Sequence, residues 1–148
     1  MSERSTEHAT FSVERVYDAS PERTFAAWSD PQAKARWYSD PEQELELDFR
    51  VGGWERHGGT LPDGREYAYR AVFHDIVPDR RIVYTYEMRL DGVRISVSLA
   101  TAEFTPERDG TRLVYTEQGA FFDGHEAPAS REHGMGGLLD LLGEWLAR

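Results

Sequence analysis

Four tyrosines and one glutamate stand where their side chains could do chemistry. Tyr69, Tyr84, Tyr86 and Tyr115 fall within runs of alternating strand-forming residues, and Glu117 follows Tyr115 by two positions. Alternate residues of a strand point to the same face, so we expect all five side chains to face the interior. A buried phenol needs a hydrogen-bond partner, and an unpaired buried carboxylate is costly. The pattern therefore favours an apolar ligand pocket with a few polar anchors.

Glu117 has several interpretations. Inside a pocket it would anchor a ligand or act as a general acid or base, because burial raises the pKa of a carboxyl group. Two plainer interpretations are a solvent-exposed strand end and a salt bridge to an arginine. We assign no catalytic residue and keep Glu117 as the one candidate. His57 and His74 are further possible bases, but each has the parity that we assign to the outer face, since His57 opposes Trp54.

The predicted ligand pocket lies between a sheet and a C-terminal helix. The helix contributes apolar residues at helical spacing, and the strands contribute apolar residues of one parity. The alternative is a dry core, because an apolar stripe on a strand usually packs against other residues. The predicted ligand-binding residues are Trp37, Phe49, Trp54, Tyr67, Tyr69, Phe73, Tyr84, Tyr86, Val97, Tyr115, Glu117, Phe121, Met135, Leu138, Leu139 and Leu142.

Metal and thiol chemistry find little support. The chain has no cysteine, which excludes disulfides, thiolate nucleophiles and cysteine-bound metals. His125, Glu126, Glu132 and His133 have side chains that suit zinc, but their spacing matches no recognised ligand pattern. We therefore predict no metal and no cofactor.

Serine nucleophiles are not favoured either. Ser96 and Ser98 alternate with Ile95 and Val97, and we expect the apolar pair to face inward and the serines outward. No Gly-x-Ser-x-Gly elbow occurs in the sequence.

Composition limits the partners. The chain has 148 residues, of which 39% are hydrophobic and 30% charged, as in one globular domain. Acidic residues outnumber basic ones by 27 to 17, which argues against a nucleic acid or an anionic membrane as partner. The polar start lacks a signal-peptide core, so we expect a cytoplasmic protein. The partner expected from the predicted pocket is a small apolar or aromatic molecule. We expect residues 1–8 to be disordered and residues 9–148 to form a single domain; the sequence indicates no particular protein partner.

The two ends of the domain combine one strand with three helices. Residues 10–17 alternate as a strand, and Ser20-Pro21 begins a helix that runs to about residue 29. Asp30-Pro31 starts a second short helix that ends near residues 37–38. Ser130 is expected to cap a last helix over about residues 130–147.

The middle of the chain predicts an antiparallel meander. Residues 44–119 hold six strand candidates joined by short turns, and parallel strands would need long crossovers. Residues 119–129 are expected to form a loop that carries Phe121 and Phe122 as a flap over the pocket. Gly134, Gly136 and Gly137 weaken the start of the last helix or allow close packing there. The predicted fold class is α+β.

Several strings, taken in order, resemble the Aha-type branch (activator of the heat-shock chaperone ATPase) of the START-like, or SRPBCC, superfamily. The similarity covers roughly residues 10–147. The strings are residues 17–22, 25–31 and 36–37, then 49–53, 63–64 and 77–85, and finally 110–113 and 137–142.

This resemblance implies a helix-grip fold, in which an antiparallel sheet curls around a long C-terminal helix and leaves an apolar cavity. The superfamily includes lipid carriers, hormone receptors, polyketide cyclases and cochaperones, so the fold does not fix the function. Our leading hypothesis is binding of a small hydrophobic or aromatic ligand without catalysis. The alternatives are a polyketide cyclase or hydrolase that uses the tyrosines and Glu117, and a cochaperone-like protein-interaction module.

Overall fold

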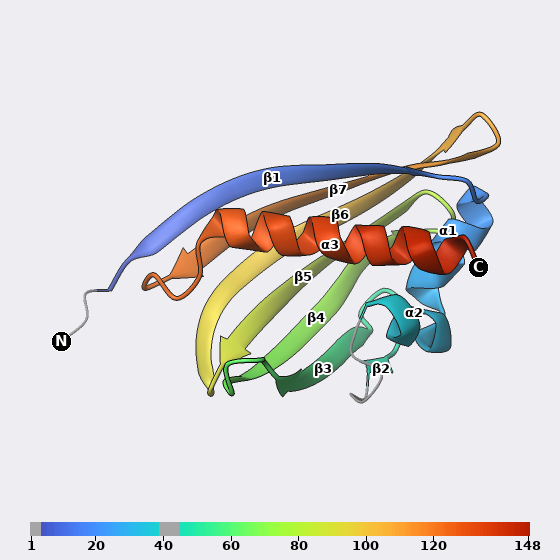
Figure 1. Cartoon of the computed structure of the whole chain (residues 1–148). Coiled ribbons are helices and arrows are strands. Elements are labelled where there is room, and N and C mark those ends of the chain that lie inside the picture. Colours follow the sequence, from blue (N-terminus) through green and yellow to red (C-terminus); the bar gives the residue numbers. More distant parts are fainter. Residues whose placement is uncertain (1–3, 39–44) are drawn as a thin grey trace.

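A computed structural model describes residues 4–38 and 45–148 and shows one antiparallel sheet curled around a long helix (Figure 1). The sheet has seven strands in the order β1-β7-β6-β5-β4-β3-β2. The helix α3 lies across its concave face, and α1 and α2 stand at one end. The elements are β1 (Thr6–Tyr17), α1 (Pro21–Ser29), α2 (Pro31–Trp37), β2 (Glu46–Leu47), β3 (Trp54–Thr60), β4 (Glu66–Val77), β5 (Arg81–Leu90), β6 (Val93–Glu107), β7 (Gly110–Phe122) and α3 (Pro128–Leu146).

This arrangement confirms the predicted α+β helix-grip fold. Consecutive strands from β2 to β7 form the meander, and β1 returns to pair with β7 along its whole length, from Thr6 opposite Phe122 to Tyr17 opposite Thr111. No helix in the described part of the chain is long and apolar enough to cross a membrane.

Local signals account for the two short helices. The Ser20 side chain accepts a hydrogen bond from the backbone N–H of Arg23, and Asp30 does the same for Gln32. A proline occupies the first turn of each helix, where a missing N–H is harmless. The helix–kink–helix therefore follows from residues within a few positions of each break.

Both long terminal elements start earlier than the sequence predicts. Residues 6–8, which we expected to be disordered, are strand residues because they pair with the end of β7. The rest of two predictions lies outside the described residues: residues 1–3 of the predicted disordered start, and Glu44 at the start of the predicted meander. Helix α3 begins at Pro128, two residues before the predicted cap Ser130. Its N-cap residue, Ala127, makes no side-chain capping bond.

A bulge in β6 reverses the predicted facing of Ser96, Val97 and Ser98, whereas Ile95 is buried as predicted. Met88 pairs with Ser96 and Arg89 with Arg94, which leaves Ile95 as an extra residue. The alternation therefore shifts by one position: Ser96 and Ser98 are buried on the concave face. Val97, predicted to line the pocket, is 41% exposed on the convex face, so this prediction was wrong.

The facing of β3 also differs from the prediction. Trp54 and His57 do lie on opposite faces, but the inward face belongs to Glu55 and His57, which are inside the curled sheet. Trp54 lies on the other face, where the Arg56 guanidinium stacks 4.3 Å from its ring centroid. The prediction placed Trp54 in the interior because the residue is hydrophobic. In the structure Glu55 takes the inward position, because Lys34 of α2 forms an ion pair with it there.

Candidate functional site

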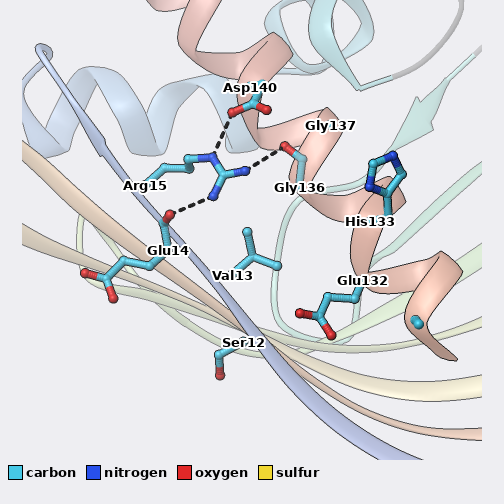
Figure 2. A pocket seen from close by; sticks show the side chains of 10 residues that line it. Ser12, Val13, Glu14, Arg15, Glu132, His133, Gly136, Gly137 and Asp140 are labelled. Carbon is cyan, nitrogen blue, oxygen red and sulfur yellow. Dashed lines mark hydrogen bonds and ion pairs between the residues drawn. The ribbon is translucent and has the colours of Figure 1, made fainter.

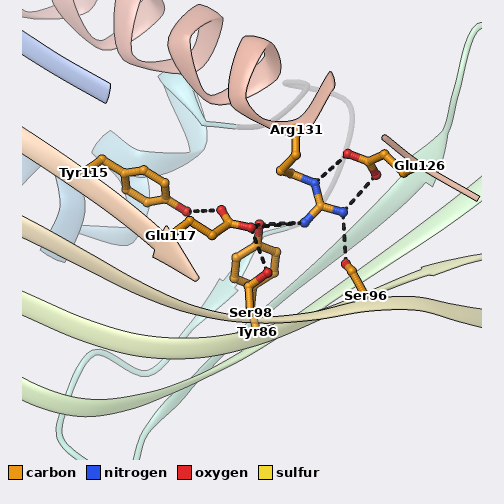
Figure 3. Close-up of polar contacts among 7 residues, drawn as sticks. All are labelled: Tyr86, Ser96, Ser98, Tyr115, Glu117, Glu126 and Arg131. Carbon is orange, nitrogen blue, oxygen red and sulfur yellow. Dashed lines mark hydrogen bonds and ion pairs between the residues drawn. The ribbon is translucent and has the colours of Figure 1, made fainter. Parts of the chain in front are cut away.

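The first buried polar group on the concave face is called here the Glu117 cluster and is shown in Figure 3. Its centre is the Glu117 carboxylate, which is 0% exposed. Three hydroxyls donate to it: Tyr86 and Ser98 to Oε2, at 2.7 Å each, and Tyr115 to Oε1 at 2.6 Å. The other members are Ser96, Glu126 and Arg131.

Arg131 brings the helix into this cluster. It lies in the first turns of α3, and its Nη1 donates to the Tyr86 hydroxyl at 2.8 Å and lies 3.4 Å from Glu117 Oε2. Its Nη2 donates to Ser96 at 2.9 Å. Tyr86 therefore accepts from the guanidinium and donates to the carboxylate, which forms a continuous chain from α3 to β7.

Glu126 and Phe121 complete the surroundings of Arg131. Both Glu126 oxygens accept from the guanidinium, at 2.7 and 2.8 Å, in the bidentate geometry that strengthens such pairs. Burial lowers the pKa of Arg131, but the hydrogen bond to Glu126 and the nearby negative charges outweigh it and raise the pKa. Phe121, predicted on an exposed loop, is buried at the end of β7, 5.1 Å beneath the guanidinium, because β7 extends to Phe122.

The buried tyrosines do not act as bases, and two of them, Tyr86 and Tyr115, are hydrogen-bond donors to Glu117. Burial raises the pKa of Tyr84, Tyr115 and Tyr69 well above 10, and it raises the pKa of Tyr86 as well. These phenols are therefore neutral near pH 7. Within the Glu117 cluster, the two carboxylates, and not the tyrosines, have the character of a base.

A second buried polar group, called here the Glu55 cluster, consists of Lys34, Glu55, His57 and Tyr67. Lys34 is the only lysine of the chain, and its Nζ lies 2.5 Å from Glu55 Oε1. Both side chains are 1% exposed. The ammonium also lies 4.6 Å from the Tyr38 ring centroid, a cation–π distance.

His57 stands beside this ion pair. Its Nδ1 is 3.4 Å from the Tyr67 hydroxyl, and its Nε2 is 3.7 Å from Glu55 Oε2. Neither Nε2 nor Oε2 has a hydrogen-bond partner within the described residues. Burial, with a smaller contribution from the Lys34 charge, lowers the pKa of His57 to about 4, so the ring is neutral at pH 7.

Tyr69 connects the two clusters. Its ring stacks on His57 at a centroid distance of 4.4 Å and on Tyr86 at 4.9 Å, in a row across β3, β4 and β5. Tyr84 packs at 6.2 Å from Tyr86 and at 5.9 Å from Phe73. The aromatic rings thus pack against one another where the sequence predicts a pocket, and a ligand must displace these contacts to enter.

An open hollow lies elsewhere, along the line where β1 meets α3 (Figure 2). It has a volume of about 620 Å³, and Arg15 and Asp140 close one end by a 2.7 Å ion pair. Glu132 and His133 line the other end. Within the described residues, no group of three histidine, aspartate or glutamate side chains is arranged to hold a metal ion.

The structure brings most of the predicted ligand-binding residues together. Tyr86, Tyr115 and Glu117 join the Glu117 cluster, and Tyr67 joins the Glu55 cluster. The remainder, apart from Val97 and Trp54, lie in or against the core: Trp37, Phe49, Tyr69, Phe73, Tyr84, Phe121, Met135, Leu138, Leu139 and Leu142.

Five functional candidates escaped the sequence reasoning: Lys34, Glu55, Ser96, Ser98 and Arg131. A signal existed for Lys34, a single lysine among arginines, whereas the parity that Glu55 shares with His57 predicted the outer face for both. No local pattern marks the serines or Arg131, because their roles depend on a bulge and on a partner in another element.

The fold and the two clusters define a helix-grip protein whose interior combines apolar packing with buried ion pairs. A family model described as "Activator of Hsp90 ATPase homolog 1-like protein" matches residues 18–147, and the chain belongs to this family.

Solved structures agree with this assignment. A protein of Rhizobium leguminosarum is 45% identical with a TM-score of 0.93, covering 98% of each chain. The protein Mll3558 of Rhizobium loti is 48% identical with a TM-score of 0.91, covering 96% of this chain and 99% of that one. CV1439 of Chromobacterium violaceum is 26% identical with a TM-score of 0.77, over 94% and 98%. A search of curated proteins gives no match.

Proposed function

We propose that the protein binds a small hydrophobic or aromatic ligand between the concave face of the sheet and the first half of α3, without catalysing a reaction. The observation that carries this proposal is the Glu117 carboxylate, fully buried among aromatic rings and contacted by three hydroxyls and a guanidinium. Replacing a buried ion pair by apolar residues is often neutral or stabilising, so stability alone does not require this cluster. Polar anchors in an apolar interior are what a ligand site needs.

The start of α3 supports an entrance. A Cβ atom added at Gly134 or Gly137 would meet nothing within 4 Å, so close packing does not require a glycine at either position. Each interior glycine lowers helix stability by about 1 kcal/mol relative to alanine. Together with the uncapped first turn, these glycines lower the cost of opening this half of the helix. Arg131 lies in the same segment, so opening also exposes Glu117.

Flat aromatic compounds in a thermal-unfolding screen test the proposal. At a concentration 100 times its Kd, a ligand stabilises the native state by about 2.7 kcal/mol. Hits should raise the Tm of the wild-type protein and of the control Glu103→Gln, which alters an exposed carboxylate of β6. The Glu117→Gln variant should respond less. A panel without hits would count against the pocket. Hits that stabilise Glu117→Gln as much as the wild type would count against Glu117 as the anchor.

A cyclase- or hydrolase-type enzyme is the second candidate, and one observation favours it. Glu117 lies within 2.7 Å of the hydroxyls of Tyr86 and Tyr115, so a carboxylate base and neutral hydrogen-bond donors converge on one point. The phenols would stabilise a developing oxyanion and the carboxylate would accept a proton. Mass spectrometry of recovered hits distinguishes the two functions: a binder returns its ligand unchanged, and an enzyme returns a compound that has lost or gained water.

A further inference from the structure

The Glu55 cluster contains two buried polar atoms whose hydrogen-bonding capacity is unused among the described residues. Glu55 Oε2 and His57 Nε2 face each other at 3.7 Å, and neither makes a hydrogen bond within residues 4–38 and 45–148. The side chains are 1% and 6% exposed. A buried polar atom without a partner costs about 1–3 kcal/mol, so two of them side by side require an explanation.

The separation of the two atoms fits one bridging oxygen. A distance of 3.7 Å is too long for a direct hydrogen bond, but an oxygen between the atoms can lie about 2.8 Å from both. Lys34 is bound to the other carboxylate oxygen, Oε1, and thereby fixes the direction of Oε2. The Lys34–Glu55 ion pair therefore holds Glu55 Oε2 in place opposite His57 Nε2.

The chemistry of the two atoms selects a hydroxyl group. The Glu55 carboxylate oxygen at 3.7 Å favours the neutral His57 tautomer that carries its hydrogen on Nε2, because two lone pairs facing each other repel. In this tautomer Nε2 is a donor, and Nδ1 is the acceptor that faces the Tyr67 hydroxyl at 3.4 Å. Glu55 Oε2 is an acceptor. A hydroxyl group accepts from Nε2 and donates to Oε2, whereas an ether or ketone oxygen cannot donate and an ammonium group cannot accept.

We propose that Glu55 Oε2 and His57 Nε2 form a hydroxyl-binding site and that the ligand of this protein is a hydroxylated aromatic compound. The inference rests on the proposed function, since it names the class of ligand for the same interior. The aromatic part follows from the surroundings: Tyr69 stacks on His57 at 4.4 Å and stands between this site and the Glu117 cluster. A flat molecule that reaches both clusters is held at two polar ends.

Matched probes separate this site from simple apolar binding. The probes are 2-naphthol, its methyl ether 2-methoxynaphthalene, and naphthalene, with Kd measured by calorimetry. The wild-type protein should bind 2-naphthol about tenfold or more tightly than the ether, because a site built for a hydroxyl loses at least one hydrogen bond with the analogue. His57→Phe keeps a ring for the Tyr69 stack and should reduce this ratio to near one. His74→Phe, on the outer face, should keep the wild-type ratio.

The single lysine gives a second readout. With ¹⁵N-lysine labelling, the ammonium signal comes from Lys34 alone and reports on its partner Glu55. Addition of 2-naphthol should shift this signal, and the ether should not. Because Glu55→Gln leaves a buried lysine unpaired and endangers folding, Lys34→Met/Glu55→Gln removes both charges together and should lose the preference for 2-naphthol.

The outcomes distinguish the two proposals. Equal affinity for 2-naphthol and its ether in the wild-type protein, with an unshifted Lys34 signal, overturns the hydroxyl site and assigns the two atoms to a bound water, while ligand binding stands. Absence of binding by all three probes overturns the hydroxyl site together with the aromatic ligand of the proposed function.

Discussion

Arg131 of α3 lies 3.4 Å from the carboxylate of Glu117 on β7, inside the protein. The residue that anchors the start of the helix is therefore also the residue that supplies a positive charge to the buried carboxylate. Any movement of the first turns of α3 changes the distance between the Glu117 carboxylate and the positive charge of Arg131. This relationship couples the proposed entrance to the proposed anchor.

Removal of the guanidinium should destabilise the fold. Arg131→Met leaves Glu117 with its three hydroxyl donors but without a counter-charge, and we expect the free energy of unfolding to fall by about 2–4 kcal/mol. Arg15→Met is the matched control, because Arg15 also pairs with α3 through Asp140 but is partly exposed. It should lose about 1 kcal/mol or less. Urea unfolding measures both, and equal losses would contradict a special role for Arg131.

Two tyrosine variants should behave in opposite ways. The Tyr115 hydroxyl donates to Glu117 Oε1, so Tyr115→Phe leaves a buried carboxylate oxygen without a partner and should cost about 1–3 kcal/mol. The Tyr84 hydroxyl is buried without a hydrogen bond of good geometry, and Tyr84→Phe should be neutral or stabilising. Chemical denaturation measures the free energy of unfolding of both variants. If Tyr84→Phe loses as much stability as Tyr115→Phe, the Tyr84 hydroxyl has a hydrogen-bond partner in solution.

Stability should decrease on acidification because of His57. Its pKa is about 4 in the folded protein against 6.5 for the free side chain, so the unfolded chain binds the proton more tightly. The stabilisation is fully present above pH 6.5 and is lost as the pH falls toward 4, by about 3 kcal/mol at most. The difference in unfolding free energy between wild type and His57→Phe should change over this window. A flat curve for His57→Phe would place His57 in solvent.

Amide hydrogen exchange should be uneven along α3. Amides of residues 131–137 should exchange faster than those of residues 139–146, and a bound ligand should slow the first group. Gly134→Ala/Gly137→Ala adds about 1 kcal/mol of helix stability per site and should slow both exchange and ligand association about fivefold per site. Gly143→Ala in the second half, where Tyr17 lies 3.2 Å from the added Cβ, should leave the first group unchanged. Uniform protection along the helix would argue against an entrance there.

The sequence by itself determined the elements, because their signals are local. Ser20-Pro21 and Asp30-Pro31 define two helix starts through hydrogen bonds that span two or three residues. Asp91-Gly92 closes a hairpin because both residues adopt positive φ, 48° and 81°. Glu117 was also assigned correctly to the interior, since β7 keeps its alternation from Leu113 to Glu117.

Tertiary structure decided which polar groups meet. One extra residue at Ile95 turned Ser98 inward and Val97 outward, and alternation counted along the sequence cannot detect such a shift. Lys34 and Glu55 are buried only because each supplies the charge that the other needs, across 21 positions of sequence, and Arg131 and Glu117 do the same across 14. A charged residue read alone belongs on the surface. Its burial becomes favourable only when the fold brings its partner within hydrogen-bonding reach.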